Sequence, residues 1–283
     1  MKISIITPNY NYAQYLPELL RSVAHQDYPD IEHVIVDDGS TDESVKVIQQ
    51  FAIDFPGRFK LIQQANAGQS AALNTALQHV TGDLILWINS DDYFTENIFS
   101  KIAAFFVSHD DVDILVGDIH FVDLDGRFIF THRNQYFGYR EAALLGFTMF
   151  LSSNAVVWRK EAMMGLAGFR ADYKCNMDGE FYSRLFYNRR LSYRPWAIAN
   201  FRKQPFSKAA ENDDRWNELM YREINQELDE NRVRIGMSSW PNFGVNALKF
   251  LLRIKRAVIR VISMRNFKKK LQIRRYQQSL SSS

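Results

Sequence analysis

Five apolar residues, Leu84 to Ile88, run directly into Asn89-Ser90-Asp91-Asp92. An uninterrupted apolar run of this length is typical of a strand that is buried on both faces inside a parallel sheet. The carboxylates would then lie at the rim of the sheet, where open α/β sheets bind their ligands. Adjacent acids repel each other, so Mg²⁺ or Mn²⁺ is a natural complement. The alternative is an acidic turn that caps a helix beginning near Glu96.

Three more strands are predicted before this one, each followed by a polar loop and a helix. They cover residues 2–8, 31–36 and 59–62, and the intervening helices carry apolar residues at spacings of three and four. This alternation predicts an α/β fold with a mostly parallel sheet and helices on both faces. The sequence contains neither the glycine fingerprint of dinucleotide-binding folds nor that of P-loop NTPases, which argues against both classes.

The second half of the chain gives weaker signals. Strands are expected at 112–118 and 153–159, with a hairpin turn at Asp125-Gly126 between them. A helix is expected to begin at Asp178, whereas residues 131–150 have no clear pattern.

Composition restricts the class of protein further. The chain has 283 residues, of which 46% are hydrophobic and 24% charged, as in globular proteins. Its single cysteine, Cys175, cannot form an internal disulfide, so a reducing compartment is expected. We expect neither a signal peptide nor a transmembrane helix, because the apolar runs are too short.

The net charge of +3 combines two oppositely charged regions. Residues 1–231 carry a net charge of −10 and residues 232–283 a net charge of +13. From Val245 the pattern is that of an amphipathic helix with one basic face, which predicts binding to an anionic membrane surface. The alternative is a helix that packs its apolar face on the protein. A nucleic acid partner is not expected, because the body is acidic and no reading motif accompanies the basic run.

Five short motifs, in this order, resemble glycosyltransferase family 2. The motifs are Ile5-Ile6-Thr7-Pro8-Asn9-Tyr10-Asn11, Val36-Asp37-Asp38-Gly39-Ser40-Thr41-Asp42, Asn66-Ala67-Gly68-Gln69-Ser70-Ala71-Ala72-Leu73-Asn74, Asn89-Ser90-Asp91-Asp92 and Met177-Asp178-Gly179-Glu180-Phe181. The resemblance spans roughly residues 2–210 and implies a GT-A fold. It divides residues 1–210 into a nucleotide-sugar-binding half, 1–118, and an acceptor-binding half, 119–210. Residues 211–283 form a helical, basic extension.

The resemblance implies a nucleotide-sugar site at the strand ends. Asp38 would accept a hydrogen bond from a ring N–H of the base, beside the Thr7-Pro8 backbone, while Asp37 forms the turn. The Asn66-Ala67-Gly68 loop would approach the sugar diphosphate, because glycine lacks a Cβ. The full predicted set is Thr7, Pro8, Asn9, Tyr10, Asp38, Asn66, Gly68, Asn74, Asn89 and Ser90.

The acidic motif resembles the Asp-x-Asp of the family, with Asn89 replacing the first acid. The resemblance assigns the divalent metal, Mn²⁺ or Mg²⁺, to Asp91, with Asp92 as support or helix cap. It also implies that Asp178 is the catalytic base, although a carboxylate in a first helical turn could instead be a cap. Glu180 is the reserve candidate. In the stretch Phe201–Lys208, Gln204 stands where many relatives have histidine, so Arg202 and Lys208 are candidate phosphate contacts.

Together these features predict an inverting, metal-dependent glycosyltransferase. It would transfer one sugar from a nucleotide-sugar, with UDP-sugars favoured, to a glycan or lipid-linked acceptor. The expected setting is cytoplasmic, at the inner face of the membrane, in lipopolysaccharide, capsule or exopolysaccharide assembly. One alternative is a catalytically impaired, membrane-docked scaffold, which Asn89 and Gln204 favour. A sugar-nucleotide pyrophosphorylase lacks support, because no glycine-rich basic loop follows the first strand.

Overall fold

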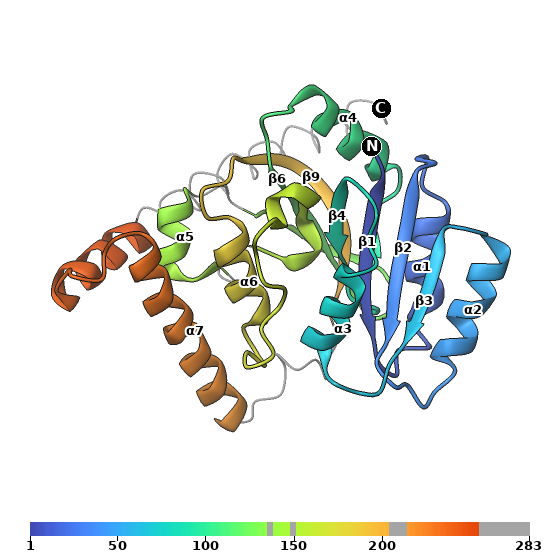
Figure 1. Ribbon diagram of the computed structural model, residues 1–283, viewed down its shortest axis with the longest axis horizontal. Coiled ribbons are helices and arrows are strands. Elements are labelled where there is room, and N and C mark those ends of the chain that lie inside the picture. The colour runs from blue at the N-terminus through green and yellow to red at the C-terminus, as the bar shows by residue number, and fades with distance from the viewer. Residues whose placement is uncertain (135–137, 148–150, 204–213, 255–283) are drawn as a thin grey trace, which may run out of the picture. The chain divides into compact units, whose positions relative to one another are not determined.

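The computed structural model describes residues 1–134, 138–147, 151–203 and 214–254 (Figure 1). The chain forms two compact units, Met1–Asn231 and Arg232–Ser283. The first unit extends past residue 210, where the transferase domain was expected to end, because most of helix α7 (Asp214–Arg234) belongs to it. The boundary between the units coincides with the change from net negative to net positive charge.

The first half of the sheet is parallel, as predicted. Its strands are β1 (Ile3–Asn9), β2 (Ile31–Asp37), β3 (Phe59–Gln63) and β4 (Leu84–Trp87), arranged in the order β3-β2-β1-β4. All four residues of β4 are buried. Its second neighbour, β8 (Val156–Arg159), is antiparallel, so β4 lies where the parallel half meets a mixed half.

The sheet continues through five more strands in the order β4-β8-β6-β9-β5, with β7 paired to β6. These are β8, β6 (Ile114–Val122), β9 (Leu191–Arg202), β5 (Tyr93–Phe94) and β7 (Phe128–His132). The predicted Asp125-Gly126 turn joins β6 to β7, with Gly126 at φ 79°. Strands β9 and β5 were not predicted. Pro195 interrupts the pattern of β9, and β5 has only two residues.

Helices cover both faces of the sheet. They are α1 (Leu16–Ala24), α2 (Ser44–Asp54), α3 (Gln69–Leu77), α4 (Ile98–Ser108), α5 (Tyr139–Leu145), α6 (Met177–Leu185) and α7, with 3-10 turns at Ser153–Ala155 and Lys160–Met163. The apolar residues of α1, α2 and α4 share one core with Ile3, Ile5 and Leu86, whereas α3 packs on β1 and β2 outside that cluster (Figure 1). Within the described ranges no helix is long and apolar enough to cross a membrane.

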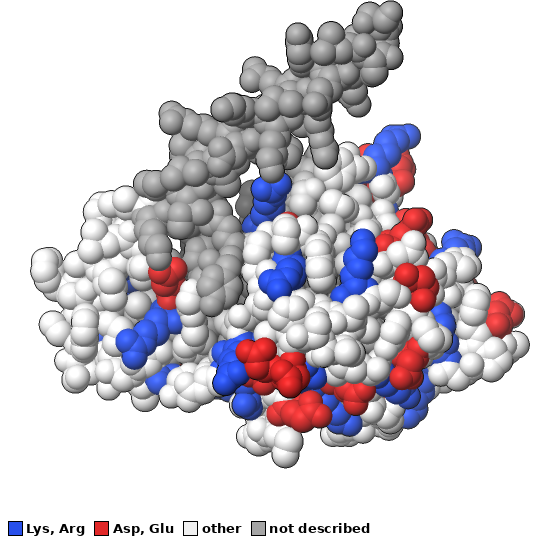
Figure 2. Space-filling view, turned by 90° about the horizontal axis from the view of Figure 1, so that it is seen from above, with Lys and Arg blue, Asp and Glu red and all other residues white. Residues whose placement is uncertain are grey.

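Charges on the molecule are mixed rather than segregated where they can be seen. On the face shown in Figure 2, acidic side chains lie beside basic side chains in several places. The negative net charge of residues 1–231 is therefore not gathered into one uninterrupted acidic patch on this face.

The second unit, taken by itself, is helical over residues 242–254. The helix predicted from Val245 is confirmed up to residue 254, and its basic continuation lies outside the described residues. Arg232 donates hydrogen bonds to Asn242 Oδ1 and to the carbonyl of Trp240, both at 3.0 Å. Several large apolar side chains of this unit are exposed, namely Trp240, Phe243, Phe250, Leu251 and Ile254.

Candidate active site at the strand ends

The polar loops after β1, β2 and β4 meet at one edge of the sheet, as predicted. Asn9 Nδ2 donates to Asp37 Oδ1 at 2.8 Å, which joins the ends of β1 and β2. Ser90 Oγ donates to the Pro8 carbonyl at 3.0 Å, which joins the end of β1 to the loop after β4. These contacts follow from the parallel register, in which Asn9 lies beside Asp37.

Asp38 holds the loop that follows β3. Its Oδ1 accepts hydrogen bonds from Gln64 Nε2 at 2.7 Å and from the Ala67 N–H at 2.9 Å, and its Oδ2 accepts from the Gly68 N–H at 2.8 Å. Gly68 has a φ of 89°, which disfavours residues with a Cβ. A carboxylate offers about four acceptor positions, so three of them are filled by this loop and its flank.

Two predicted residues beside Asp38 are buried in the protein. Asn9 is 1% exposed, and its Oδ1 has no hydrogen-bond partner in the described part of the chain. Thr7 is fully buried, and its hydroxyl lies 2.8 Å from His33 Nε2. The Thr7 side chain is therefore closed to a ligand, which fits the expectation that this segment contributes backbone. Asp37 accepts hydrogen bonds from Asn9 and Ser40, consistent with a turn-forming role.

Other predicted contacts are accessible. Tyr10 is 46% exposed, and Asn66 lies exposed in the loop after β3. Asn89 is partly buried, and its Oδ1 accepts hydrogen bonds from Gln69 Nε2 and Trp87 Nε1, both at 3.2 Å.

Asn74 does not fulfil the expectation of a ligand contact. Its Nδ2 donates to the Phe169 carbonyl at 2.8 Å, and its Oδ1 accepts from the Phe169 N–H at 2.7 Å. A Cβ at Gly168 would lie 2.1 Å from Asn74 Oδ1, so glycine is required there while this pair of bonds persists. Asn74 therefore fastens the segment before α6 to α3.

The two acids after β4 have different surroundings. Asp92 is 1% exposed, and its Oδ2 accepts from Asn154 Nδ2 at 2.6 Å while its Oδ1 accepts from the Arg202 N–H at 2.8 Å. Asp91 is only partly buried. Burial raises the pKa of both carboxyls, and the charge of Asp91 raises that of Asp92 further. Asp92 is thus a structural support, in line with the role expected for it.

Arg202 is buried and supports the loop after β4, so it is not the phosphate contact that was considered from the sequence. It is 3% exposed, and its guanidinium donates to the carbonyls of Asp91 and Leu124 and pairs with Glu18. The guanidinium also lies over the rings of Tyr15 and Tyr93, at 5.4 and 5.6 Å from their centroids. Gln204 and Lys208 lie outside the described residues.

The edge around Asp91 fits a hard divalent cation. Burial and the closeness of the two carboxyls raise their pKa values, which means that their ionised forms are disfavoured unless a cation lies beside them. Because Asp92 uses both oxygens within the protein, Asp91 is the residue that would bind the ion. Among the residues that the structure describes, no group of three or more His, Cys, Asp or Glu could hold a metal. The ion would therefore take most of its ligands from a diphosphate and water, as Mg²⁺ commonly does.

Asp178 lies in the first turn of α6, close to the nucleotide half. The preceding residue, Met177, accepts a hydrogen bond at its sulfur from Ser70 Oγ at 3.4 Å, and Ser70 stands in the first turn of α3. The Asp178 carboxylate accepts a hydrogen bond at Oδ1 from the Gly179 N–H, at 2.9 Å. Burial raises the pKa of Asp178, as expected for a carboxyl that can take up a proton.

Glu180, the reserve candidate for the base, is not available for that role. It is fully buried, and its two oxygens accept hydrogen bonds from Arg184 Nε at 2.6 Å and Arg184 Nη2 at 2.7 Å. Such a bidentate pair occupies the carboxylate.

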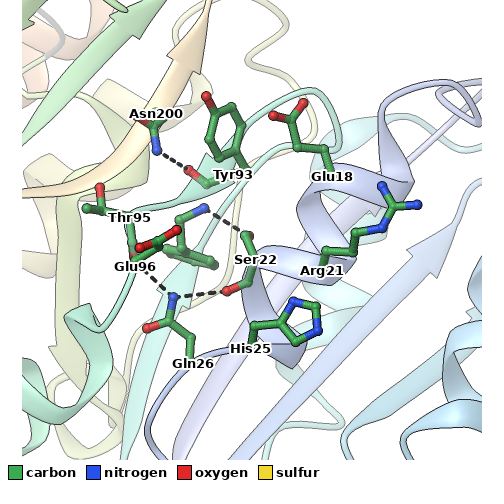
Figure 3. A pocket seen from close by; sticks show the side chains of 10 residues that line it. Glu18, Arg21, Ser22, His25, Gln26, Tyr93, Thr95, Glu96 and Asn200 are labelled. Carbon is green, nitrogen blue, oxygen red and sulfur yellow. Dashed lines mark hydrogen bonds between the residues drawn. The ribbon is translucent and has the colours of Figure 1, made fainter.

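A pocket of about 450 Å³ lies between α1 and β5 (Figure 3). None of the predicted site residues lines it. Ser22 Oγ accepts from the Phe94 N–H at 3.0 Å, and Gln26 Nε2 donates to the Thr95 carbonyl at 2.9 Å. Polar side chains of α1 thus satisfy the backbone beside the short edge strand β5, which gives this region a structural role.

Sequence reasoning missed Asn154 and Glu223 and gave Arg202 a different role. Asn154 and Arg202 hold Asp92 from positions distant in the sequence. Glu223 of α7 accepts hydrogen bonds from the backbone just before α6. The only signal in the sequence was the spacing of Glu223, Glu227 and Glu230, which places three acids on one face of a helix.

The fold and the strand-end site together define a GT-A-type α/β protein. Residues 4–165, more than half of the chain, match the family described as Glycosyl transferase family 2, and the chain belongs to this family.

Individual relatives match over shorter stretches. An uncharacterized glycosyltransferase of Nostoc sp. is 42% identical over 124 residues, which are 44% of this chain and 37% of that protein. The poly(ribitol-phosphate) β-N-acetylglucosaminyltransferase TarS of Staphylococcus aureus is 34% identical over 38% of this chain and 19% of its own length. A PGL/p-HBAD biosynthesis glycosyltransferase of Mycobacterium bovis is 29% identical over 68% of this chain and 72% of its own. The chain thus matches well under half of the first two proteins.

Solved structures confirm the fold. Residues 1–349 of S. aureus TarS in complex with UDP-GlcNAc superpose with a TM-score of 0.65 at 22% identity, covering 88% of this chain and 70% of that one. The mannosyltransferase PcManGT of Pyrobaculum calidifontis, in complex with GDP-Man and Mn²⁺, gives a TM-score of 0.56 at 18% identity, covering 91% and 80%.

Proposed function

We propose that this protein is an inverting glycosyltransferase that uses a nucleoside-diphosphate sugar and a divalent cation. The observation that supports the proposal is the contact between Ser70, in the first turn of α3, and Met177, the residue before Asp178. In the proposed enzyme Asp91 would bind the metal and Asp178 would act as the base.

The chemistry assigned to Asp178 is proton removal. The acceptor hydroxyl oxygen forms a bond to the anomeric carbon as the bond from that carbon to the diphosphate oxygen breaks on the opposite face. The bonding electrons leave with the diphosphate, and the hydroxyl proton moves to Asp178, whose raised pKa makes it a stronger base than an ordinary aspartate. A bound divalent cation, held by Asp91, would neutralise charge on the leaving diphosphate.

The donor is proposed to be a nucleotide-sugar, with UDP-sugars favoured. Structures that share this fold are described in complex with UDP, UDP-GlcNAc and GDP-Man, and one of them also with Mn²⁺. This supports the donor class but not one base, because their sequence identities are all below one quarter.

The acceptor is proposed to be a glycan or a lipid-linked saccharide. The rings of Phe130, Phe121 and Phe201 form a row across β7, β6 and β9, with centroids 4.6 and 5.0 Å apart. Phe130 is 46% exposed, and the row ends next to Arg202, whose N–H holds Asp92. Aromatic faces offer apolar surface against which a sugar ring can pack. Relatives named for poly(ribitol-phosphate) and PGL/p-HBAD chemistry support a role in cell-surface glycan assembly.

Donor turnover tests the proposed function directly. Purified protein incubated with a panel of nucleotide-sugars and Mn²⁺ or Mg²⁺ is expected to release a nucleoside diphosphate from one donor, slowly by hydrolysis and faster with a saccharide acceptor. Calorimetry with UDP and GDP gives an independent measure of binding. If a nucleotide binds but no donor is turned over, the catalytically impaired scaffold replaces the enzyme. If no nucleotide binds and no donor is turned over, both the enzyme and the scaffold proposals are wrong.

Residues 245–283, the basic tail, are proposed to dock the protein on an anionic membrane, at the cytoplasmic face. In the second unit Phe243 is 85% exposed, Phe250 63% and Leu251 60%, and apolar side chains of this size on a basic helix suit an interfacial position. Each basic residue near such a surface contributes about 1 kcal/mol, so the 13 basic residues after Asn231 supply ample attraction.

Removal of residues 245–283 is therefore expected to abolish sedimentation with vesicles that contain phosphatidylglycerol. The full chain should sediment with these vesicles at low salt and less at high salt, because the attraction is screened. Neutral phosphatidylcholine vesicles are the control. Equal sedimentation of the full and shortened chains would refute the proposal.

A further inference from the structure

Three glutamates on one face of α7 hold the segment that leads into α6. Glu223, Glu227 and Glu230 are spaced by four and three residues, so their side chains project in the same direction. Glu230 forms two hydrogen bonds with Arg170, at 2.9 and 3.0 Å. Each of the other two contacts a residue just before Asp178.

Glu223 fixes the backbone immediately before α6. It is 2% exposed and accepts hydrogen bonds from the N–H groups of Lys174, Cys175 and Asn176, at 2.8, 2.8 and 2.9 Å. Three backbone donors on one carboxylate leave the segment little freedom to move.

The side chain of Glu227 contacts Asn176, the residue immediately before the first turn of α6. It is fully buried, and its Oε2 accepts from Asn176 Nδ2 at 2.6 Å, while its Oε1 accepts from the Phe147 N–H at 3.3 Å and from Asn231 Nδ2 at 3.2 Å. Asn176, the residue before α6, is 1% exposed, and its Oδ1 has no hydrogen-bond partner among the residues that the structure describes. The Asn176 amide could rotate so that this oxygen accepts a hydrogen bond from the O–H of a neutral Glu227. The pair can thus accommodate either protonation state of Glu227.

We propose that Glu227 is a positioning residue for Asp178, which it influences in two ways: it anchors Asn176, two residues away, and its charge acts on the Asp178 carboxylate. The catalytic part of this inference rests on the proposed function, since it takes Asp178 as the base. The contact between Glu227 and Asn176 and the electrostatic effect on Asp178 do not depend on the reaction.

The electrostatic part of the argument follows from burial and neighbouring charge. Burial raises the pKa of Glu227 to about 7, hydrogen bonds from Asn176 and Phe147 oppose the shift, and the charge of Asp178 adds to it. The titratable groups near Glu227 include Asp178 on α6, Tyr173 in the preceding segment, and Glu223 and Glu230 on the same face of α7, while Phe147, after α5, contributes its N–H. Because the repulsion acts on both groups, an ionised Glu227 makes Asp178 a stronger base, but only above the pKa of Glu227, since below it Glu227 is neutral.

The kinetic test is the pH profile of kcat/KM for Glu227→Gln. Asp178 must be ionised to act, so activity falls as the pH falls through its pKa. In the parent, kcat/KM should also rise as the pH rises through the pKa of Glu227, about 7, because its charge then makes Asp178 a stronger base. Glu227→Gln should remove this rise, while the donor KM changes less than about twofold. Glu218→Gln is the matched control, because Glu218 is an exposed glutamate of the same helix. A variant that loses activity equally at every pH would show a merely structural role and overturn the inference.

A second test needs no catalysis. The thermal unfolding midpoint is measured at pH 5 and pH 8 for Asp178→Asn, Glu227→Gln and the double variant. At pH 8 both carboxylates are ionised and repel, so the two single shifts should sum to more than the double shift, whereas at pH 5, with Glu227 neutral, they should add. Coupling at pH 8 without any donor turnover would uphold the Glu227–Asp178 link and reject the proposed function. Additive shifts at both pH values would reject the link, whether or not the protein is an enzyme.

Discussion

Replacing Asp178 by asparagine is expected to lower the kcat of sugar transfer by about 10² to 10⁴-fold, the usual contribution of a positioned general base. Asparagine has nearly the same shape and can still accept the hydrogen bond from the Gly179 N–H, so α6 should keep its first turn. What is lost is the ability to take up the acceptor proton. The measurement is kcat with saturating donor and acceptor, together with the Kd of the nucleoside diphosphate.

Nucleotide binding separates this expectation from general damage to the site. The Kd should change less than about threefold, because a base is needed in the transition state and not for donor binding. Asp110→Asn is the matched control, since Asp110 is an exposed acid at the end of α4. Wild-type activity in Asp178→Asn would remove this residue from the mechanism.

The second large effect is expected at Asp91. Asp91→Asn should reduce kcat/KM by roughly 10²-fold or more, because a metal ion stabilises developing charge by several kcal/mol. The variant should also need a higher concentration of Mn²⁺ or Mg²⁺ for half-maximal activity. Chelation of the metal should abolish activity in the parent, and renewed addition should restore it.

Asp27→Asn, an exposed acid outside the strand-end cluster, serves as the control for charge removal. If the parent keeps full activity in excess chelator, then the metal assignment is wrong, whatever the effect of Asp91→Asn. The Kd of the nucleoside diphosphate for the inactive Asp178→Asn variant, measured at increasing Mn²⁺ or Mg²⁺ concentrations, tests metal binding independently of turnover.

The parallel half of the fold could be predicted because its signals are local. Each of its strands is a short apolar run, and each ends in residues that suit a loop at the rim of a sheet. The meeting of Asn9 with Asp37 and of Ser90 with Pro8 then follows from the parallel arrangement. The mixed half was harder to predict, because β9 contains Pro195 and forms through partners about 75 to 80 residues away.

Side-chain roles within the site depended on distant partners. Asn74 was expected to face a ligand, but its two bonds go to Phe169, 95 residues later in the chain. The hydrogen bonds of Glu223 and Glu227 could not be predicted from the sequence of α7 alone, because their partners lie about 50 residues earlier and near residue 147. The change from net negative to net positive charge at residue 231 is visible in the sequence and coincides with the boundary between the two compact units.

The hydrogen bonds of Asp38 have a consequence for donor selection. Its carboxylate already accepts hydrogen bonds from two backbone N–H groups and from the amide of Gln64. A nucleotide base that donates to Asp38 would therefore mainly replace the hydrogen bond from Gln64. Such an exchange yields little net free energy, because one donor replaces another. A base without a ring N–H at that place could not replace the hydrogen bond that Gln64 gives up and would bind less well. In the proposed enzyme, Asp38 would act as a discriminator between bases rather than as a source of affinity.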